Sequence, residues 1–131
     1  MLGNILGAFP MGSKQLSVLV KIEPVTYERE SQTQINFQVP LIDPDDTDVI
    51  LERGICYKLS SSPGLPTVDD NKIFETGPFD QEGFEMLLDL ATNTEYKFRP
   101  YVIGKYGIIY GDEIIITTSE INNRYRIILT S

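Results

Sequence analysis

The sequence contains no histidine, no tryptophan and a single cysteine, Cys56. Without histidine, the chain cannot build on its own an imidazole general base, a Ser-His-Asp triad, a Cys-His dyad or a histidine-ligated zinc site. One cysteine excludes an internal disulfide and any metal site made of several thiolates. We therefore expect Cys56 to be a structural thiol and the fold to be stabilised by packing alone.

Basic residues are also scarce. The chain has 11 of them against 19 acidic residues, a net charge of -8 and a pI near 4.4. This charge repels phosphate backbones and anionic membranes, so neither nucleic acid nor a membrane is an expected partner. No apolar run reaches the roughly 18 residues of a membrane span. A secretory signal needs a positively charged start, but no Lys or Arg precedes Lys14. We therefore expect synthesis without Sec export, or a processed fragment.

Alternating apolar and polar residues dominate the 131-residue sequence. The clearest case is 33–39, where Ile35, Phe37 and Val39 alternate with polar side chains, as in a half-buried strand. Further strands are predicted over 16–22, 49–59, 73–76, 83–90, 94–104, 110–118 and 124–130, with a short helix as the alternative at 83–90. Pro and Gly punctuate these runs. The pattern predicts an all-β, antiparallel β-sandwich over 15–119, preceded by an extended N-terminal arm (1–14) and followed by a C-terminal strand or tail (120–131).

Three stretches carry a resemblance to a known family. They are Glu52-Arg-Gly-Ile-Cys-Tyr57, Pro66-Thr-Val-Asp-Asp-Asn-Lys72, and Leu90-Ala-Thr-Asn-Thr-Glu-Tyr-Lys-Phe-Arg-Pro-Tyr101, followed by Tyr110-Gly-Asp-Glu113. In this order and spacing they resemble the fibronectin type III-like (Ig-like β-sandwich) modules of Bacteroidetes proteins and their phages, over about residues 16–118. The resemblance implies a fibronectin type III/immunoglobulin-like scaffold, whose function must be sought in its surfaces.

The resemblance also makes expectations about single residues. Tyr96, with Leu90, matches a tyrosine corner, in which the phenol oxygen bonds to an upstream backbone group. Inward-facing residues should be Tyr96, Phe98, Pro100 and Val102, and outward-facing residues Lys97, Arg99 and Tyr101. Arg53 and Arg99 should form an outer-face ladder with Glu52 or Glu113. The family usually has Ala where this chain has Pro100, which predicts a bulge or an N–H position that points away from a partner strand.

Several acidic residues are candidates for a metal-binding or catalytic site. The loop containing Asp43, Asp45, Asp46 and Asp48 offers oxygen ligands for calcium but lacks EF-hand spacing, and we interpret it as a solvated loop. Asp69 and Asp70 are interpreted as turn residues. Asp80, Glu82 and Glu85 are a weak match to paired glycosidase acids, since no cleft is implied. We predict no catalytic residue, no cofactor and no bound metal.

Apolar residues outside the sandwich are the strongest functional signal. Leu2, Ile5, Leu6 and Phe9 in the arm need a surface to cover. In the tail, Tyr125, Ile127 and Leu129 alternate with Arg124, Arg126 and Ile128, so this segment can extend an exposed sheet edge of its own subunit or of the next. These seven arm and tail residues are the predicted partner-docking set. Around the turn at 104–107, Tyr106, Ile108 and Ile109 are predicted surface-contact residues, with local packing as the alternative.

These observations together predict a non-enzymatic structural protein that binds other protein subunits, as a homo- or hetero-oligomer. With the family resemblance, they favour a phage virion component, either capsid-decorating, head-fibre or tail-associated, assembled in the host cytoplasm. The alternative is a carbohydrate-binding or adhesion module of a Bacteroidetes surface protein, located at the bacterial cell surface. A glycan contact is compatible with either hypothesis.

Overall fold

The computed structural model describes residues 20–42, 50–79 and 81–119. These residues form ten strands and no helix, so the described part of the chain has no helix able to cross a membrane. The strands are β1 (Lys21–Ile22), β2 (Thr26–Arg29), β3 (Gln34–Val39), β4 (Leu41–Ile42), β5 (Ile50–Leu59), β6 (Asn71–Thr76), β7 (Phe84–Asp89), β8 (Glu95–Gly104), β9 (Gly107–Tyr110) and β10 (Ile114–Thr117).

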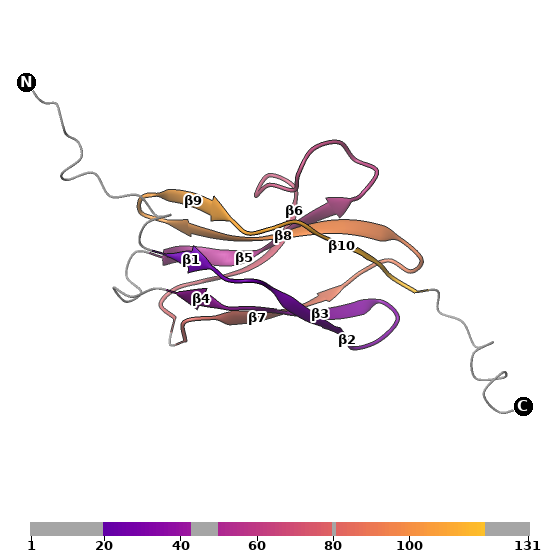
Figure 1. The fold of residues 1–131 in the computed structure, drawn as a ribbon, viewed down its shortest axis with the longest axis horizontal. Coiled ribbons are helices and arrows are strands. Elements are labelled where there is room, and N and C mark those ends of the chain that lie inside the picture. The colour runs from indigo at the N-terminus through magenta and orange to yellow at the C-terminus, as the bar shows by residue number, and fades with distance from the viewer. Residues whose placement is uncertain (1–19, 43–49, 80, 120–131) are drawn as a thin grey trace, which may run out of the picture.

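The strands form two layers of antiparallel sheet (Figure 1). One sheet has the order β10-β8-β5-β6, with β9 also pairing with β8, and the other has the order β2-β3-β7. A short pair, β1-β4, lies beside the second sheet. The described residues thus form the predicted all-β antiparallel sandwich.

The core is built from the inward positions of both sheets. Ile35, Phe37 and Val39 are buried on β3, and β7 buries every second residue from Phe84, which establishes a strand rather than a helix at 83–90. Across the layers, the rings of Phe37 and Phe98 lie 4.9 Å apart. Burying such aromatic and branched side chains stabilises each by about 1.5–3 kcal/mol over exposure.

The tyrosine corner is confirmed. The hydroxyl oxygen of Tyr96 accepts a hydrogen bond from the backbone N–H of Ala91 at 3.1 Å, five residues upstream. Thr118 secures the same corner, because its hydroxyl group donates to the carbonyl oxygen of Ala91 at 2.6 Å. The chain is therefore fixed where it crosses from β7 to β8.

Pro100 lies inside β8 without breaking the pairing to β5. Its partner there is Ile55 in continuous register, and the one irregularity between these strands lies at Ile50 and Glu52. The carbonyl oxygen of Pro100 instead accepts a hydrogen bond from Gly111 at 2.9 Å, on the side of β8 away from β5. Because N–H and C=O of one strand residue point to the same side, the missing donor of Pro100 falls where β9 has ended and β10 has not begun. The second of the two expectations for Pro100 is confirmed.

Strand boundaries differ from prediction at two places. The predicted strand 110–118 is divided into the end of β9 and β10 (Ile114–Thr117), because residues 111–113 belong to no strand, although the N–H of Gly111 still bonds to Pro100. The missing donor at Pro100 explains why β8 cannot continue its ladder there. The structure also contains β2, which no alternation indicated because all four of its residues are exposed at a sheet edge. The predicted strands at 16–22 and 49–59 are described only from residues 20 and 50, and the one at 124–130 lies outside the described residues.

The outward face of β8 is not exposed, contrary to expectation. Tyr101 is fully buried and Lys97 is nearly so. Residues 60–70, which we call the covering loop, bond to Lys97 and Arg99 on this face, and Tyr101 packs against Tyr110 and Lys72. Lys97 donates to the carbonyl oxygen of Ser62, and Arg99 Nε donates to that of Pro66 at 2.9 Å. The alternating pattern predicts correctly which side chains of β8 face outward, but it does not predict the loop that covers them.

The predicted ladder of Arg53 and Arg99 is wrong. Arg53 pairs across β5 and β8 with Val102, which is a core residue, so its side chain is on the inner face, whereas Arg99 pairs with Cys56 on the opposite face. Arg53 forms an ion pair with Glu75 at 2.6 Å, and its guanidinium group lies 4.0 Å from the ring centre of Phe79. A buried guanidinium group needs such hydrogen-bond and aromatic partners.

Candidate functional site

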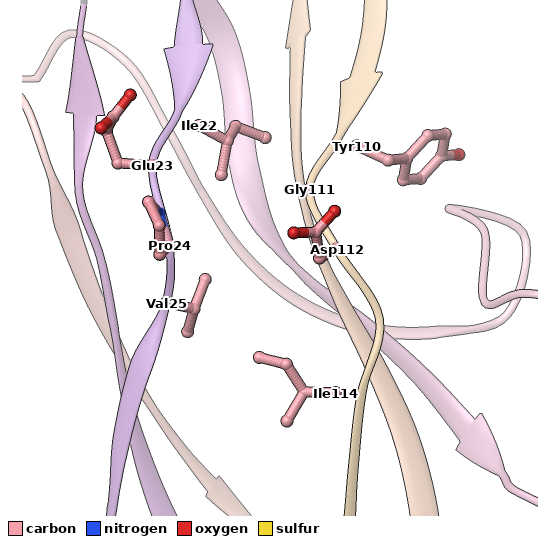
Figure 2. Close-up of a pocket in the computed structure, with 8 residues that line it drawn as sticks. All are labelled: Ile22, Glu23, Pro24, Val25, Tyr110, Gly111, Asp112 and Ile114. Atoms are coloured by element: carbon pink, nitrogen blue, oxygen red, sulfur yellow. The ribbon is translucent and has the colours of Figure 1, made fainter.

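The two sheets separate along one edge. Residues 20–25 lie on one side of this opening and residues 109–114 on the other. Two adjoining pockets of about 300 and 340 Å³ share Ile22 and Tyr110 as lining residues. They form one continuous depression, which we call the edge groove, and Figure 2 shows the first of its two pockets.

The edge groove exists because both of its sides are interrupted strands. Pro24 separates β1 from β2, and residues 111–113 separate β9 from β10. On the first side, the backbone N–H of Glu23 donates to Pro40 at 2.9 Å, so this segment is bonded to its own sheet and not across the opening. The two stretches that lie outside the strands face each other, as Figure 2 shows.

The floor of the edge groove is apolar. Val20 is part of the core, and four half-buried residues pack against that core, namely Ile22, Val25, Ile109 and Ile114. In Figure 2 the side chains of Ile22, Val25 and Ile114 project into the opening. A partly exposed aliphatic floor of this kind can bind apolar side chains of another segment.

Gly111 determines how closely the two sides of the edge groove approach each other at one point. A Cβ atom at this position would lie 2.6 Å from Cγ of Pro100 and 3.0 Å from Cγ2 of Ile22. A side chain there would push the two edges apart, so glycine allows the edges to approach. Tyr110 points away from the opening, where its hydroxyl oxygen accepts from the N–H of Val68 at 3.1 Å. Tyr110 thus packs against the covering loop with its ring outside the opening.

The rim of the edge groove carries negative charge. Asp112 is exposed at the mouth, and Glu113 follows it in the chain and is also exposed. Glu23 lines the opposite side, with its carboxylate directed away from the opening in Figure 2. Within the described ranges, none of these three carboxylates forms an ion pair. An uncompensated acidic rim above an apolar floor favours a ligand with both apolar and basic groups.

The far end of this edge is closed. Arg29 of β2 donates from Nη1 to the carbonyl oxygen of Thr117 on β10 at 2.8 Å. The backbone N–H of Ser119 donates to the carbonyl oxygen of Gln32 at 3.0 Å. The opening is therefore confined to the end of the sandwich that contains β1 and β9.

A second cluster of perturbed groups lies on the outward side of β5 and β8. Tyr101 donates to a carboxylate oxygen of Glu52 at 2.5 Å, and Lys72 donates to the same oxygen at 2.8 Å. Burial raises the pKa of Tyr101, and its bond to Glu52 raises it further. Burial alone would raise the pKa of Glu52, but the hydrogen bonds from Lys72 and Tyr101 outweigh it and lower the value from 4.5. These shifts follow from a partly buried network of paired groups and need no ligand to explain them.

Cys56 lies in the same layer. It is buried on the face opposite Ile55 and Tyr57, and burial raises the pKa of its thiol to about 11. A thiol with this pKa is a poor nucleophile at neutral pH, which agrees with a structural role.

The predicted surface-contact residues do not share one face. Tyr106 and Ile108 are exposed at the β8–β9 turn, at 41% and 44%. Ile109, with the opposite phase in β9, packs against the core and lines the edge groove. Tyr106 and Ile108 thus remain exposed contact candidates, and the structure places Ile109 elsewhere.

The predicted docking residues Leu2, Ile5, Leu6, Phe9, Tyr125, Ile127 and Leu129 lie outside the described residues, as do the acidic loop at 43–48 and Asp80. Glu85 is exposed and accepts a hydrogen bond from Gln38 at 3.2 Å. Asp70 is a turn residue as predicted, because it accepts from the N–H of Thr67 at 2.8 Å. The part of the chain that the structure describes contains no group of three or more potential metal ligands.

The architecture is that of a fibronectin type III-like β-sandwich. Among solved structures, the chain is similar to the fibronectin type III domain of human collagen XX, with a TM-score of 0.52 and 22% sequence identity over 74% of this chain and 88% of that one. No protein-family model and no curated protein matches the sequence. At this identity the likeness establishes the fold, and the origin of the chain does not follow from it.

Proposed function

We propose that this chain is a non-enzymatic structural module of a larger protein assembly, a virion component of a phage that infects Bacteroidetes. In this proposal it is capsid-decorating, head-fibre or tail-associated, and residues 1–14 and 124–130 dock it onto other subunits. The observation that carries the proposal is the edge groove, because it offers a partner an apolar floor and backbone edges without chemistry of its own.

Three further points support a binding rather than a catalytic role. Fibronectin type III-like modules are commonly structural or binding modules. The pKa shifts of Tyr101 and Cys56 are accounted for mainly by burial, and that of Glu52 by its hydrogen bonds to Lys72 and Tyr101. Among the acids that weakly match a glycosidase pair, Glu85 is exposed on the outer side of β7 and lines an open depression that contains no second carboxylate of the described residues.

The test is the molar mass in solution, measured by light scattering, of the full chain and of a chain that begins at Gln15. We expect the full chain to associate with rising concentration and the shortened chain to be a folded protein with weaker association. If both are monomeric and unfold at the same temperature, the arm does not dock onto copies of this chain, and only assembly with a different subunit is left.

A second candidate function is the adhesion module, and exposed Tyr106 and Ile108 favour it. An exposed aromatic ring at a loop tip can stack on a sugar. Binding of the full chain to a glycan array, abolished by Tyr106→Ala and retained by Tyr27→Ala, would support this function. Tyr27 is a matched control because it is also 41% exposed but lies on β2.

A further inference from the structure

We propose that the edge groove is the receiving site for residues 124–130 of a second copy of this chain. The proposal rests on the proposed assembly function and assigns its contact surface. The incoming segment would lie extended along the opening, with Tyr125, Ile127 and Leu129 over the apolar floor.

The period and length of this segment match the edge groove. Residues 20–25 on one side of the opening would span about 20 Å if fully extended, and three alternate side chains from 125 to 129 span about 13 Å. The two pockets are apolar where alternate side chains would enter, next to Ile109 and Ile114. Of the backbone at the two interruptions, the N–H groups of Glu23 and Gly111 already donate within this chain and Pro24 has none, so an extended segment would pair mainly along residues 112–113.

The charges are complementary as well. Residues 124–131 contain Arg124 and Arg126 and no acidic residue, in a chain of net charge -8. The rim opposite them carries Asp112 and Glu113, which pair with no described cation. Alternation places both arginines on the side of the segment away from the floor, where the rim lies.

The arm fits less well. Leu2, Ile5, Leu6 and Phe9 do not alternate, and the first basic residue of the chain is Lys14. An extended segment on this floor needs apolar residues at every second position. The arm is therefore not the proposed occupant.

The chain's own tail is also a poor occupant. A tight turn at Asn122–Asn123 would place residues 126 and 128 opposite Ser119 and Thr117. The outward groups of those two residues already bond to Gln32 and Arg29. In that register Thr130 would reach only Ile115, short of the edge groove. A neighbouring copy has neither restriction.

Cross-linking of full chains tests the contact directly. We would mix an Asp112→Cys chain with an Arg126→Cys chain under mild oxidation, with Cys56 silent because it is buried. The expected product is a disulfide-linked heterodimer that Glu85→Cys, on the outer side of β7, does not form with Arg126→Cys. A chain carrying both Asp112→Cys and Arg126→Cys that cross-links only within itself would overturn the proposal, since the occupant would be its own tail.

Charge exchange supplies the second measurement. Asp112→Lys with Glu113→Lys should weaken self-association about tenfold at low salt, and adding Arg124→Glu with Arg126→Glu should restore it. The matched control, Glu85→Lys with Asp89→Lys, makes the same charge change on the outer side of β7 and should have no such effect. If the chain associates and the rim and tail variants match the control, the groove assignment is wrong while the assembly function stands. If the unmodified chain does not associate, the groove assignment also fails.

Discussion

The two outer faces of the sandwich have the same alternating period and opposite environments. On the sheet β2-β3-β7, the outward residues are polar or exposed, and Gln38 links Thr26 to Glu85 through hydrogen bonds of 3.2 Å. We call this the bare face. On the sheet that contains β5 and β8, the outward residues Lys97 and Tyr101 are buried, Lys97 against the covering loop and Tyr101 against Tyr110 and Lys72, and we call this the covered face. Strand period thus fixes which residues share a face, while burial depends on what lies over it.

The largest contrast should appear when one large side chain is removed from each face. Tyr101→Ala on the covered face should cost about 3–5 kcal/mol in the free energy of unfolding, because a fully buried ring leaves a cavity. Leu87→Ala on the bare face should cost less than about 1 kcal/mol, since Leu87 is 48% exposed. Urea unfolding of the two variants measures both values. Equal losses would show that the covering loop does not bury the face in solution.

Tyr101→Phe refines this result. It keeps the ring and removes only the hydroxyl group that donates to Glu52. The expected loss is about 0.5–1.5 kcal/mol, and about 1.5–3 kcal/mol if the carboxylate depends on this donor as a charged acceptor. A loss as large as that of Tyr101→Ala would mean that the hydrogen bond, rather than packing, stabilises the covered face.

The next prediction concerns how the free energy of unfolding depends on pH. The pKa of Glu52 is lowered in the folded chain, so its contribution to stability is present above its ordinary value of 4.5 and is lost as the pH falls through the lowered value. Glu52→Gln should therefore destabilise the protein at pH 7 by about 1–3 kcal/mol and make the unfolding free energy less steep in acid. Chemical unfolding of the unmodified protein and of Glu52→Gln between pH 7 and pH 3 compares the two slopes, and parallel curves would exclude Glu52 as the acid-sensitive group.

Local pattern explains which parts of this fold could be predicted from the sequence. Alternation at Ile35, Phe37 and Val39 is enough to define β3, because both the period and the buried face follow from the residues themselves. Tyr96 and Pro100 could be interpreted from a family motif in which each position has a fixed backbone role. Arg53 also lies two positions before Ile55 and four before Tyr57, so the alternation along the strand predicts an inward side chain, although its charge favours the outer face.

The edge groove could not be predicted in this way. Its sides come from Pro24 and from Gly111, which are 87 positions apart, and each break alone resembles an ordinary turn. Their opposition depends on the distance between the two sheets, which no local pattern encodes. The covering loop is similar, because its turn residues indicated a loop at 60–70 but not that Pro66 would be buried against Arg99.

The smallest contrast concerns the covering loop itself. Gly64 has φ of +85°, a backbone conformation that other residues adopt at a cost, and its surroundings leave room for a methyl group 3.7 Å from Lys58 Nζ. Gly64→Ala should therefore destabilise the protein by about 1 kcal/mol through backbone strain and not through a clash. Ser61→Ala, an exposed change in the same loop, should stay within about 0.5 kcal/mol. If Gly64→Ala also speeds hydrogen exchange of the Val68 amide, which bonds to Tyr110, the loop covers the face as one unit. Unchanged exchange at Val68 would show that its two halves are held independently.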